Sequence, residues 1–456
     1  MAASFRDPSG FVYWRGKRLL RQINRGFAER WDELESSAIL PDLQRRGLLI
    51  RHEPADLGDA YAPTIAHAVI APEPLPFISY PYEWSFSQLR DAALATLEAQ
   101  FVALARGYWL RDASAFNVQF RDGKPILIDT LSLERADLGR PWIAYRQFCE
   151  HFLAPLALMA YRDVRCSLLL RDFIDGIPLD FAARLLPGRT RLNLGLGSHV
   201  HVHARSQSRA ADPETAGPRS ARRMGRLRHE ALLAGLRRAI ERLKWRPGET
   251  AWAGYADHTS YSAPAEASKD AQVRRLLESA GGRVVWDLGA NTGRFSAIAA
   301  DLGRDVVAWD SDPGAAELHY LAIRQRGVPN VLPLLVDLAN PSPGIGWANV
   351  ERAAFTERAN ADVVLALALV HHLNVGRNVR LAMIVELLAT LAPQTIVEYV
   401  PESDPMVQRL LAPHRDHQPY PAIETFRDVF RARFQILEEI PVEDSARRLL
   451  RLSRKA

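Results

Sequence analysis

The chain has 456 residues, of which 48% are hydrophobic and 24% charged, values that are ordinary for globular proteins and predict two or three domains. It contains no run of 18 apolar residues, and its N-terminus lacks the apolar core of a signal peptide, so we expect a cytoplasmic protein that does not contact the membrane. Arginine supplies nearly all of the positive balance of +5, and the two cysteines are too few for a disulfide framework or a zinc ribbon.

The N-terminal region contains a polar loop that follows a long amphipathic helix candidate at residues 85–110. Asp112 precedes Asn117 by five residues, and Asp129 follows about a dozen residues later, after an apolar strand. This spacing resembles the catalytic loop and the metal-binding acid of protein kinases and aminoglycoside phosphotransferases. The resemblance implies that Asp112 would accept the hydroxyl proton, while Asn117 and Asp129 would hold magnesium.

Other parts of the kinase pattern are missing from this region. Neither a glycine-rich loop nor a strand with a phosphate-binding lysine lies upstream; Lys17 is a poor substitute for that lysine and Arg21 a possible one. Phosphoryl transfer depends on electrostatic stabilisation of this kind. For residues 1–203 we therefore expect an α+β, kinase-like domain that has lost or changed its chemistry. An active phosphotransferase, and a loop that Asx turns merely fix, are the alternatives.

Residues 204–230 are expected to link two domains, because they are polar and end in the arginine-rich run 219–228, which we interpret as the start of a basic helix. Aromatic-studded basic strands do not accompany this run, so we do not expect nucleic-acid binding. Just before the linker, His199, His201 and His203 alternate and would share one face of a strand. Since no nearby acid or cysteine completes the set, we predict no metal site.

Residues 231–280 are expected to be a helical lead-in to the second domain. A helix candidate at 266–280 stands directly before that domain, and its neighbourhood supplies candidates for a lid over a bound ligand. Aromatic residues before a helix are more often a hydrophobic staple, which is the alternative. The lid candidates are Tyr255, Tyr261, Ser262 and Lys269.

The most informative motif lies at the start of residues 281–456. Val284 to Ser296 reads as a buried strand that enters a glycine-rich turn and then a helix, in the form D-x-G-x-x-x-G with Asp287, Gly289 and Gly293. The motif lacks the last interval of the dinucleotide fingerprint and the Lys-Ser/Thr of a P-loop. Small residues at positions 289 and 293 let the backbone approach a nucleotide and let the helix pack close to the strand.

The next strand candidate, residues 305–310, ends at Asp310, roughly 20 residues past the loop, where a carboxylate that binds ribose hydroxyls is expected. Asp312 is interpreted as the cap of the following helix. Three further strands, at 331–338, 361–369 and 395–400, alternate with helix candidates. This alternation predicts an α/β domain whose parallel sheet is covered on both faces and binds ligands at the carboxyl ends of its strands.

The loop, the acidic strand ends and a closing strand pair at 434–440 and 448–453 resemble the class I S-adenosylmethionine-dependent methyltransferases, which have a Rossmann-like, seven-stranded, mainly parallel sheet. The resemblance implies S-adenosylmethionine as the cofactor, with Asp337 facing the adenine amino group and the helix at 266–280 covering the methionine end. The donor-binding candidates are Asp287, Gly289, Asn291, Gly293, Asp310, Asp337 and Leu338.

The same resemblance implies substrate-facing groups at the ends of the fourth and fifth strands. His371, His372 and Glu398 stand there, and one of the histidines could act as a general base because its ordinary pKa is near neutrality. That the histidine pair only shapes the turn and packs against the donor is an equally open interpretation.

The whole chain resembles a bacterial family of methyltransferases described as host-specificity nodulation proteins, on stretches at residues 76–84, 112–117, 128–131 and 145–155. We therefore predict in-line methyl transfer to an unidentified acceptor, with a small molecule favoured. One alternative is a bifunctional protein whose N-terminal half also transfers phosphate from ATP. Another is a non-catalytic binding protein with a vestigial donor pocket.

Overall fold

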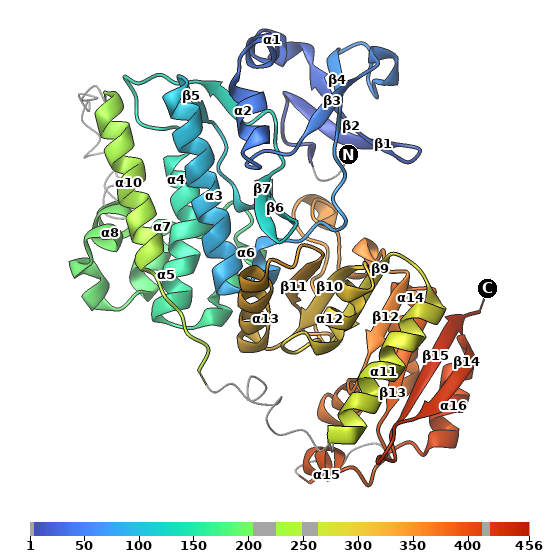
Figure 1. The fold of residues 1–456 in the computed structure, drawn as a ribbon. Coiled ribbons are helices and arrows are strands. Elements are labelled where there is room, and N and C mark those ends of the chain that lie inside the picture. The colour runs from blue at the N-terminus through green and yellow to red at the C-terminus, as the bar shows by residue number, and fades with distance from the viewer. Residues whose placement is uncertain (1–3, 204–224, 249–262, 413–419, 456) are drawn as a thin grey trace. The chain divides into compact units, whose positions relative to one another are not determined.

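The computed structural model describes residues 4–203, 225–248, 263–412 and 420–455 (Figure 1). They form two compact units: an N-terminal unit of Met1–Arg246 with Gly344–Arg352, and a C-terminal unit of Pro247–Pro343 with Ala353–Ala456. Helix α10 (Arg226–Arg242) packs on helix α3 within the N-terminal unit. The first unit therefore extends beyond residue 203 and takes in part of the region expected to be linker and lead-in. No helix in the described ranges is long and apolar enough to cross a membrane.

The N-terminal unit begins with a four-stranded antiparallel sheet in the order β1-β2-β4-β3. Helices α1 and α2 connect β2 to β3, and a mainly helical region follows the sheet. The strands are β1 (Gly10–Arg15), β2 (Arg18–Asn24), β3 (His52–Ala55), β4 (Ala66–Pro72), β5 (Tyr108–Leu110), β6 (Val118–Arg121), β7 (Lys124–Leu127) and β8 (Leu133–Arg135). The helices are α1 (Ala28–Ser36), α2 (Ile39–Arg45), α3 (Phe86–Ala105), α4 (Tyr145–Phe148), α5 (Ala154–Tyr161), α6 (Leu169–Asp172), α7 (Leu179–Leu185), α8 (Leu194–Leu196), the 3-10 turn η5 (Ala115–Asn117) and the π-helices η6 (Cys149–Leu153) and η9 (Gly197–Val202).

Helix α3 is the central helix of this unit and differs from its prediction in two ways. Ser85 caps its N-terminus together with Gln88 in a capping box, as the sequence suggests. The helix ends at Ala105, and Tyr108–Leu110 is instead strand β5, which pairs with β8. The helix is also buried on most of its surface, because α5, α10, β5 and β7 all pack against it. The prediction of one amphipathic helix through residue 110 is therefore wrong.

The strand geometry considered for His199, His201 and His203 is also wrong, because residues 197–202 form the π-helix η9. His199 Nδ1 lies 2.8 Å from the Tyr145 hydroxyl, and His201 Nε2 lies 2.8 Å from the Thr190 hydroxyl. Burial lowers the pKa of His199 to about 4. These two rings serve as buried hydrogen-bond partners of the helical region.

The C-terminal unit is built on a seven-stranded sheet in the order β11-β10-β9-β12-β13-β15-β14. Strands β9 to β13 run parallel, while β15 runs antiparallel to both β13 and β14. The predicted mainly parallel sheet with a closing strand pair is therefore confirmed, and within that pair only β15 runs against the other strands. The strands are β9 (Val284–Leu288), β10 (Asp305–Asp310), β11 (Val331–Leu335), β12 (Val363–Ala366), β13 (Gln394–Tyr399), β14 (Phe434–Pro441) and β15 (Arg448–Arg454). The helices are α11 (Ala263–Ala280), α12 (Arg294–Asp301), α13 (Pro313–Arg326), α14 (Leu381–Leu391), α15 (Pro405–Leu411), α16 (Ile423–Arg431) and the π-helix η13 (His372–Gly376).

An aromatic cluster fills the core beside the first two strands of this sheet. Trp286 of β9 and Trp309 of β10 are fully buried, with ring centroids 5.4 Å apart. Phe355 lies 5.3 Å from the first ring and 5.1 Å from the second. Truncation of such a ring typically costs about 3–5 kcal/mol, so this cluster supports the strands that carry the glycine-rich loop.

The connection between β11 and β12 leaves the C-terminal unit and returns to it. The Phe355 N–H donates to the Ser342 carbonyl at 2.9 Å and closes the base of the excursion. Residues Gly344–Arg352 belong to the N-terminal unit, where buried Glu351 pairs with Arg6 at 2.9 Å and the Arg352 guanidinium lies 4.6 Å from the centre of the Phe116 ring. Phe116 is part of the loop that carries Asp112 and Asn117.

Candidate functional site

The glycine-rich loop connects β9 to α12 and depends on left-handed backbone conformations. Gly289 has a φ of +74° and Gly293 a φ of +91°. A Cβ atom on Gly293 would lie 2.0 Å from His319 Nε2, so glycine is required there by helix packing as well as by the backbone. Gly293 does not line the cavity described below, whereas Gly289 and Asn291 do.

Asp310 stands at the carboxyl end of β10, beside this loop. Its Oδ2 accepts the Asn291 N–H at 2.8 Å, and its Oδ1 accepts the Asp312 N–H at 2.8 Å. Burial raises the pKa of Asp310 although these backbone donors oppose the shift. Asp312 accepts from the N–H groups of Gly314 and Ala315, which confirms it as the cap of α13. The loop and the second strand end are thus held together through one carboxylate.

Asp287 is deeply buried, with only 2% of its surface exposed. The Ser296 hydroxyl donates to its Oδ2 at 2.6 Å. Burial raises the pKa of Asp287 to about 6, and the nearby Asp310 carboxylate adds to the rise. This carboxylate therefore ties the strand to the first turn of α12 at an electrostatic cost.

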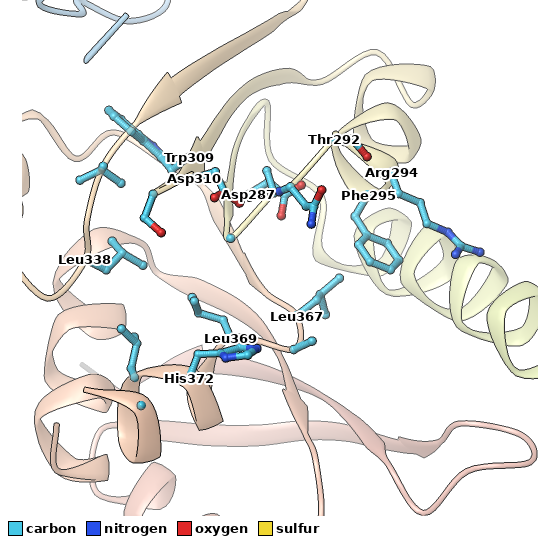
Figure 2. A pocket seen from close by; sticks show the side chains of 18 of the residues that line it. Asp287, Thr292, Arg294, Phe295, Trp309, Asp310, Leu338, Leu367, Leu369 and His372 are labelled. Atoms are coloured by element: carbon cyan, nitrogen blue, oxygen red, sulfur yellow. Dashed lines mark hydrogen bonds between the residues drawn. The ribbon is translucent and has the colours of Figure 1, made fainter. Parts of the chain in front are cut away.

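A cavity of about 440 Å³ lies at the carboxyl ends of the parallel strands, within the size range of small-molecule sites. Figure 2 shows Asp287 and Asp310 beside the glycine-rich loop, with His372 facing that loop across the cavity. Apolar side chains form much of the remaining wall. The lining includes Asp287, Gly289, Asn291, Phe295, Asp310, Val336, Asp337, Leu338, Leu367, Leu369, His372 and Leu373.

Asp337 lines the cavity at the end of β11, next to Leu338. Its Oδ1 accepts the Ala339 N–H at 3.0 Å, and its Oδ2 pairs with Arg377 at 3.1 Å. Both residues of this pair are solvent-accessible, so the interaction contributes little to stability.

The two adjacent histidines face different spaces, a distinction that sequence alone does not make. His372 lines the large cavity, whereas His371 lines a separate cavity of about 10 Å³ together with Asn374, Glu398 and Tyr420. Burial and Arg447 lower the pKa of His372 to about 4, and burial lowers that of His371 strongly. Both rings are therefore neutral at neutral pH. Among the described residues, neither ring nitrogen of His371 has a hydrogen-bond partner.

Glu398 is held in a buried chain of alternating charges. It accepts Lys269 Nζ at 2.6 Å and lies 3.4 Å from Arg447 Nη1, and Arg447 Nε donates to Asp404 at 2.8 Å. The four side chains are at most 8% exposed. Lys269 and Arg447 line the large cavity, whereas Glu398 and Asp404 do not. One end of the cavity is therefore lined by two cations, and the carboxylates that pair with them lie outside its lining.

Arg447 and Asp404 were not identified as site residues from the sequence. Asp404 has a local signal, because it precedes Pro405 and caps α15 through the Met406 N–H at 2.9 Å. Arg447 lies in a polar turn before β15, where no motif singles it out. Of the lid candidates, Lys269 of α11 lines the cavity, while Tyr255, Tyr261 and Ser262 lie outside the described residues.

The N-terminal unit brings together the three residues of the predicted kinase-like loop. Burial and the neighbouring Asp129 raise the pKa of Asp112, whereas the Ser114 N–H and the Gln147 and Asn117 amides oppose the rise. The Asn117 carbonyl accepts the Ile128 N–H at 2.9 Å, which fixes one loop against the other. The relationship of this unit to protein kinases stays a prediction.

Sheet order and site together define the class of protein. A seven-stranded sheet with this strand order, a glycine-rich loop after β9 and acids at the next two strand ends has the Rossmann-like fold of class I methyltransferases. No family model matches the chain. The nodulation protein NoeA of Rhizobium meliloti (strain 1021) is 36% identical over 422 residues, which cover 91% of this chain and 88% of that protein. The chain therefore belongs to the NoeA family of nodulation proteins.

Solved methyltransferase structures resemble part of this chain at low sequence identity. Magnesium protoporphyrin IX methyltransferase from Synechocystis PCC 6803, solved with bound S-adenosylmethionine, has 16% identity and a TM-score of 0.31, over 46% of this chain and 86% of that chain. The N-methyltransferase NodS from Bradyrhizobium japonicum WM9, solved with S-adenosylhomocysteine, has 13% identity and a TM-score of 0.31, over 42% of this chain and 89% of that chain.

Proposed function

We propose that the C-terminal unit binds S-adenosylmethionine and transfers its methyl group to an acceptor, for which we favour a small molecule. The observation that carries the proposal is the position of Asp310 in the cavity. Each of its oxygens accepts one backbone N–H, and a carboxylate oxygen can accept a second hydrogen bond. Asp310 can therefore receive the two ribose hydroxyls while its orientation stays fixed by the loop.

The remaining lining residues fit the other parts of the donor. Asp337 can accept a hydrogen bond from the adenine amino group, and Leu338 supplies an apolar contact for the ring. Lys269 and Arg447 form the cationic end of the cavity, which suits the methionine carboxylate. The cavity thus has hydroxyl-binding and carboxylate-binding ends.

Bound S-adenosylmethionine would supply an electrophilic methyl group on a sulfonium that leaves as a neutral thioether. Of the predicted catalytic residues, His372 is our candidate for contact with the acceptor, because it lines the cavity and is neutral at neutral pH. Its imidazole can accept the acceptor proton, although its lowered pKa makes it a weak base. We assign Glu398 a positioning role, because two buried cations engage it, and His371 a supporting role behind its neighbour.

Calorimetric titration of S-adenosylmethionine into the full chain tests this proposal. We expect saturable binding that Asp310→Ala weakens by about 1–3 kcal/mol, which is roughly 5- to 150-fold in affinity. Asp305→Ala is the matched control, because Asp305 lies at the opposite end of the same strand and pairs with Arg283. Absence of binding to the natural chain would refute the proposal and favour a vestigial pocket. Binding without turnover of any acceptor would favour a non-catalytic binding protein.

A further inference from the structure

The acid predicted to bind magnesium in the N-terminal unit already has a cation partner within the chain. Arg21 Nη2 lies 2.5 Å from Asp129 Oδ1, and the two side chains are only 8% and 15% exposed. Arg21 stands on β2, which is paired on both sides, by β1 and β4. The position of the guanidinium beside the carboxylate is therefore fixed, because β2 cannot shift without breaking its hydrogen bonds to both neighbouring strands.

Other donors engage the rest of the Asp129 carboxylate. The Leu131 N–H donates to Oδ1 at 3.1 Å, and the Ser132 hydroxyl makes a short hydrogen bond to Oδ2. Burial raises the pKa of Asp129, but Arg21 and these hydrogen bonds outweigh burial, and the pKa lies below its ordinary value. Asp129 is thus a stable anion without any bound metal.

The surroundings of the pair continue the same pattern. Asp7 Oδ2 lies 4.0 Å from Arg21 Nη2, and Arg111 Nη2 donates to Asp7 Oδ1 at 3.1 Å. The cluster of Asp7, Arg21, Arg111 and Asp129 therefore carries two positive and two negative charges. Within the described residues, no group of three or more histidine, cysteine or acidic side chains is arranged to hold a metal ion.

We propose that Arg21 is an internal cation that takes the place of magnesium at Asp129, so that the N-terminal unit holds its kinase-like loop together without a metal. Magnesium is usually bound through one or two carboxylates, and here the guanidinium is at hydrogen-bond distance from the acid that would provide one. The residues present thus do not fit the magnesium that the kinase resemblance implies. The N-terminal unit is, on this inference, a metal-independent module, and the phosphotransferase alternative is disfavoured.

Hydrogen exchange of peptides covering β2 and residues 118–135 in the full chain tests this inference, with and without Mg²⁺, Mn²⁺ and Mg²⁺-ATP. We expect no divalent-ion effect in the natural chain. Arg21→Met should increase exchange in these peptides, and added Mn²⁺ should restore part of the protection. Arg21→Met with Asp129→Asn removes both charges and should recover protection without responding to Mn²⁺. Arg18→Met is the control on the same strand, because Arg18 pairs with Asp59 at the surface.

Two results would overturn the inference. The first is protection of the natural chain by Mg²⁺-ATP that is lost in Asp129→Asn, since this would show that Arg21 yields its place to a metal. The second is a folded Arg21→Met variant whose hydrogen exchange does not respond to Mn²⁺, since Arg21 would then not occupy a site that a metal cation can fill. If Arg21→Met does not fold, the natural chain and Arg21→Lys, which keeps the cation, still decide the question by their response to Mg²⁺-ATP.

Discussion

Asp287 gives the sharpest quantitative test of how the site is built. At neutral pH the chain should be less stable with the ionised aspartate at this position than with a neutral asparagine. Burial raises its pKa to about 6 from an ordinary value of 3.8. At 1.36 kcal/mol per pH unit, ionisation of this buried group at neutral pH costs about 3 kcal/mol. Asparagine has nearly the same shape, and its side-chain oxygen can still accept from the Ser296 hydroxyl. We therefore expect Asp287→Asn to raise the free energy of unfolding of the C-terminal unit at neutral pH.

The sign of the pH dependence separates this explanation from a packing effect. Between about pH 4 and 6 the folded chain holds a proton at Asp287 that the unfolded chain has released, so stability falls as pH rises through this window. The gain from Asp287→Asn should thus be near zero around pH 4 and reach up to about 3 kcal/mol at neutral pH. Hydrogen exchange of peptides spanning β9 and β10 measures it, with exposed Asp301→Asn as control. An equal effect at both pH values would refute the reasoning.

Three further predictions concern the same unit. Gly303→Ala should cost about 1–2 kcal/mol because of its left-handed backbone alone. Gly293→Ala should destabilise the C-terminal unit by more than this, because a Cβ atom there would also meet His319. Urea unfolding compares the two variants, and equal costs would contradict the packing argument. Lys269→Met should lower the free energy of unfolding by about 3–5 kcal/mol, because it leaves buried Glu398 short of a partner. Adding Glu398→Gln to this variant should recover part of the loss in the same assay. If the effects of the two substitutions simply add, the residues do not form a coupled network. Once an acceptor is known, His372→Ala should slow transfer about 10²–10⁴-fold with donor affinity retained. The rate of the natural chain should be flat around neutrality and fall only as pH drops towards about 4, where the imidazole becomes protonated; an inflection near pH 6.5 that disappears in His372→Ala would contradict the lowered pKa.

The C-terminal fold could be predicted because its signals are local. A buried apolar strand, a glycine turn and a carboxylate at each strand end occur within short stretches of sequence, and the order of these stretches fixes the order of strand ends. Asp310 and Asp337 line the cavity for this reason. Gly293 shows the limit of such reasoning, since the atom that demands glycine there is the His319 ring on another helix.

The cationic end of the cavity could not be predicted in the same way. Lys269 and Glu398 are 129 residues apart, and Arg447 is a further 49 residues along the chain. Arg447 reaches Glu398 because β15 lies antiparallel beside β13, and Lys269 reaches it because α11 packs on β13. No local pattern encodes either placement. Likewise, adjacent histidines read as equivalent in sequence, whereas the π-helix that begins at His372 turns the two rings towards different cavities.

The excursion between β11 and β12 has a consequence for biosynthesis. The N-terminal unit includes Gly344–Arg352, which are synthesised only after β9, β10 and β11 of the C-terminal sheet. The first unit therefore cannot be completed until most of the chain has been translated. Arg6, for example, pairs with Glu351, which lies 345 residues later in the sequence. Cutting the gene at codon 246 would yield an N-terminal fragment without its last segment. The N-terminal unit should accordingly be complete only when both units are expressed as one chain.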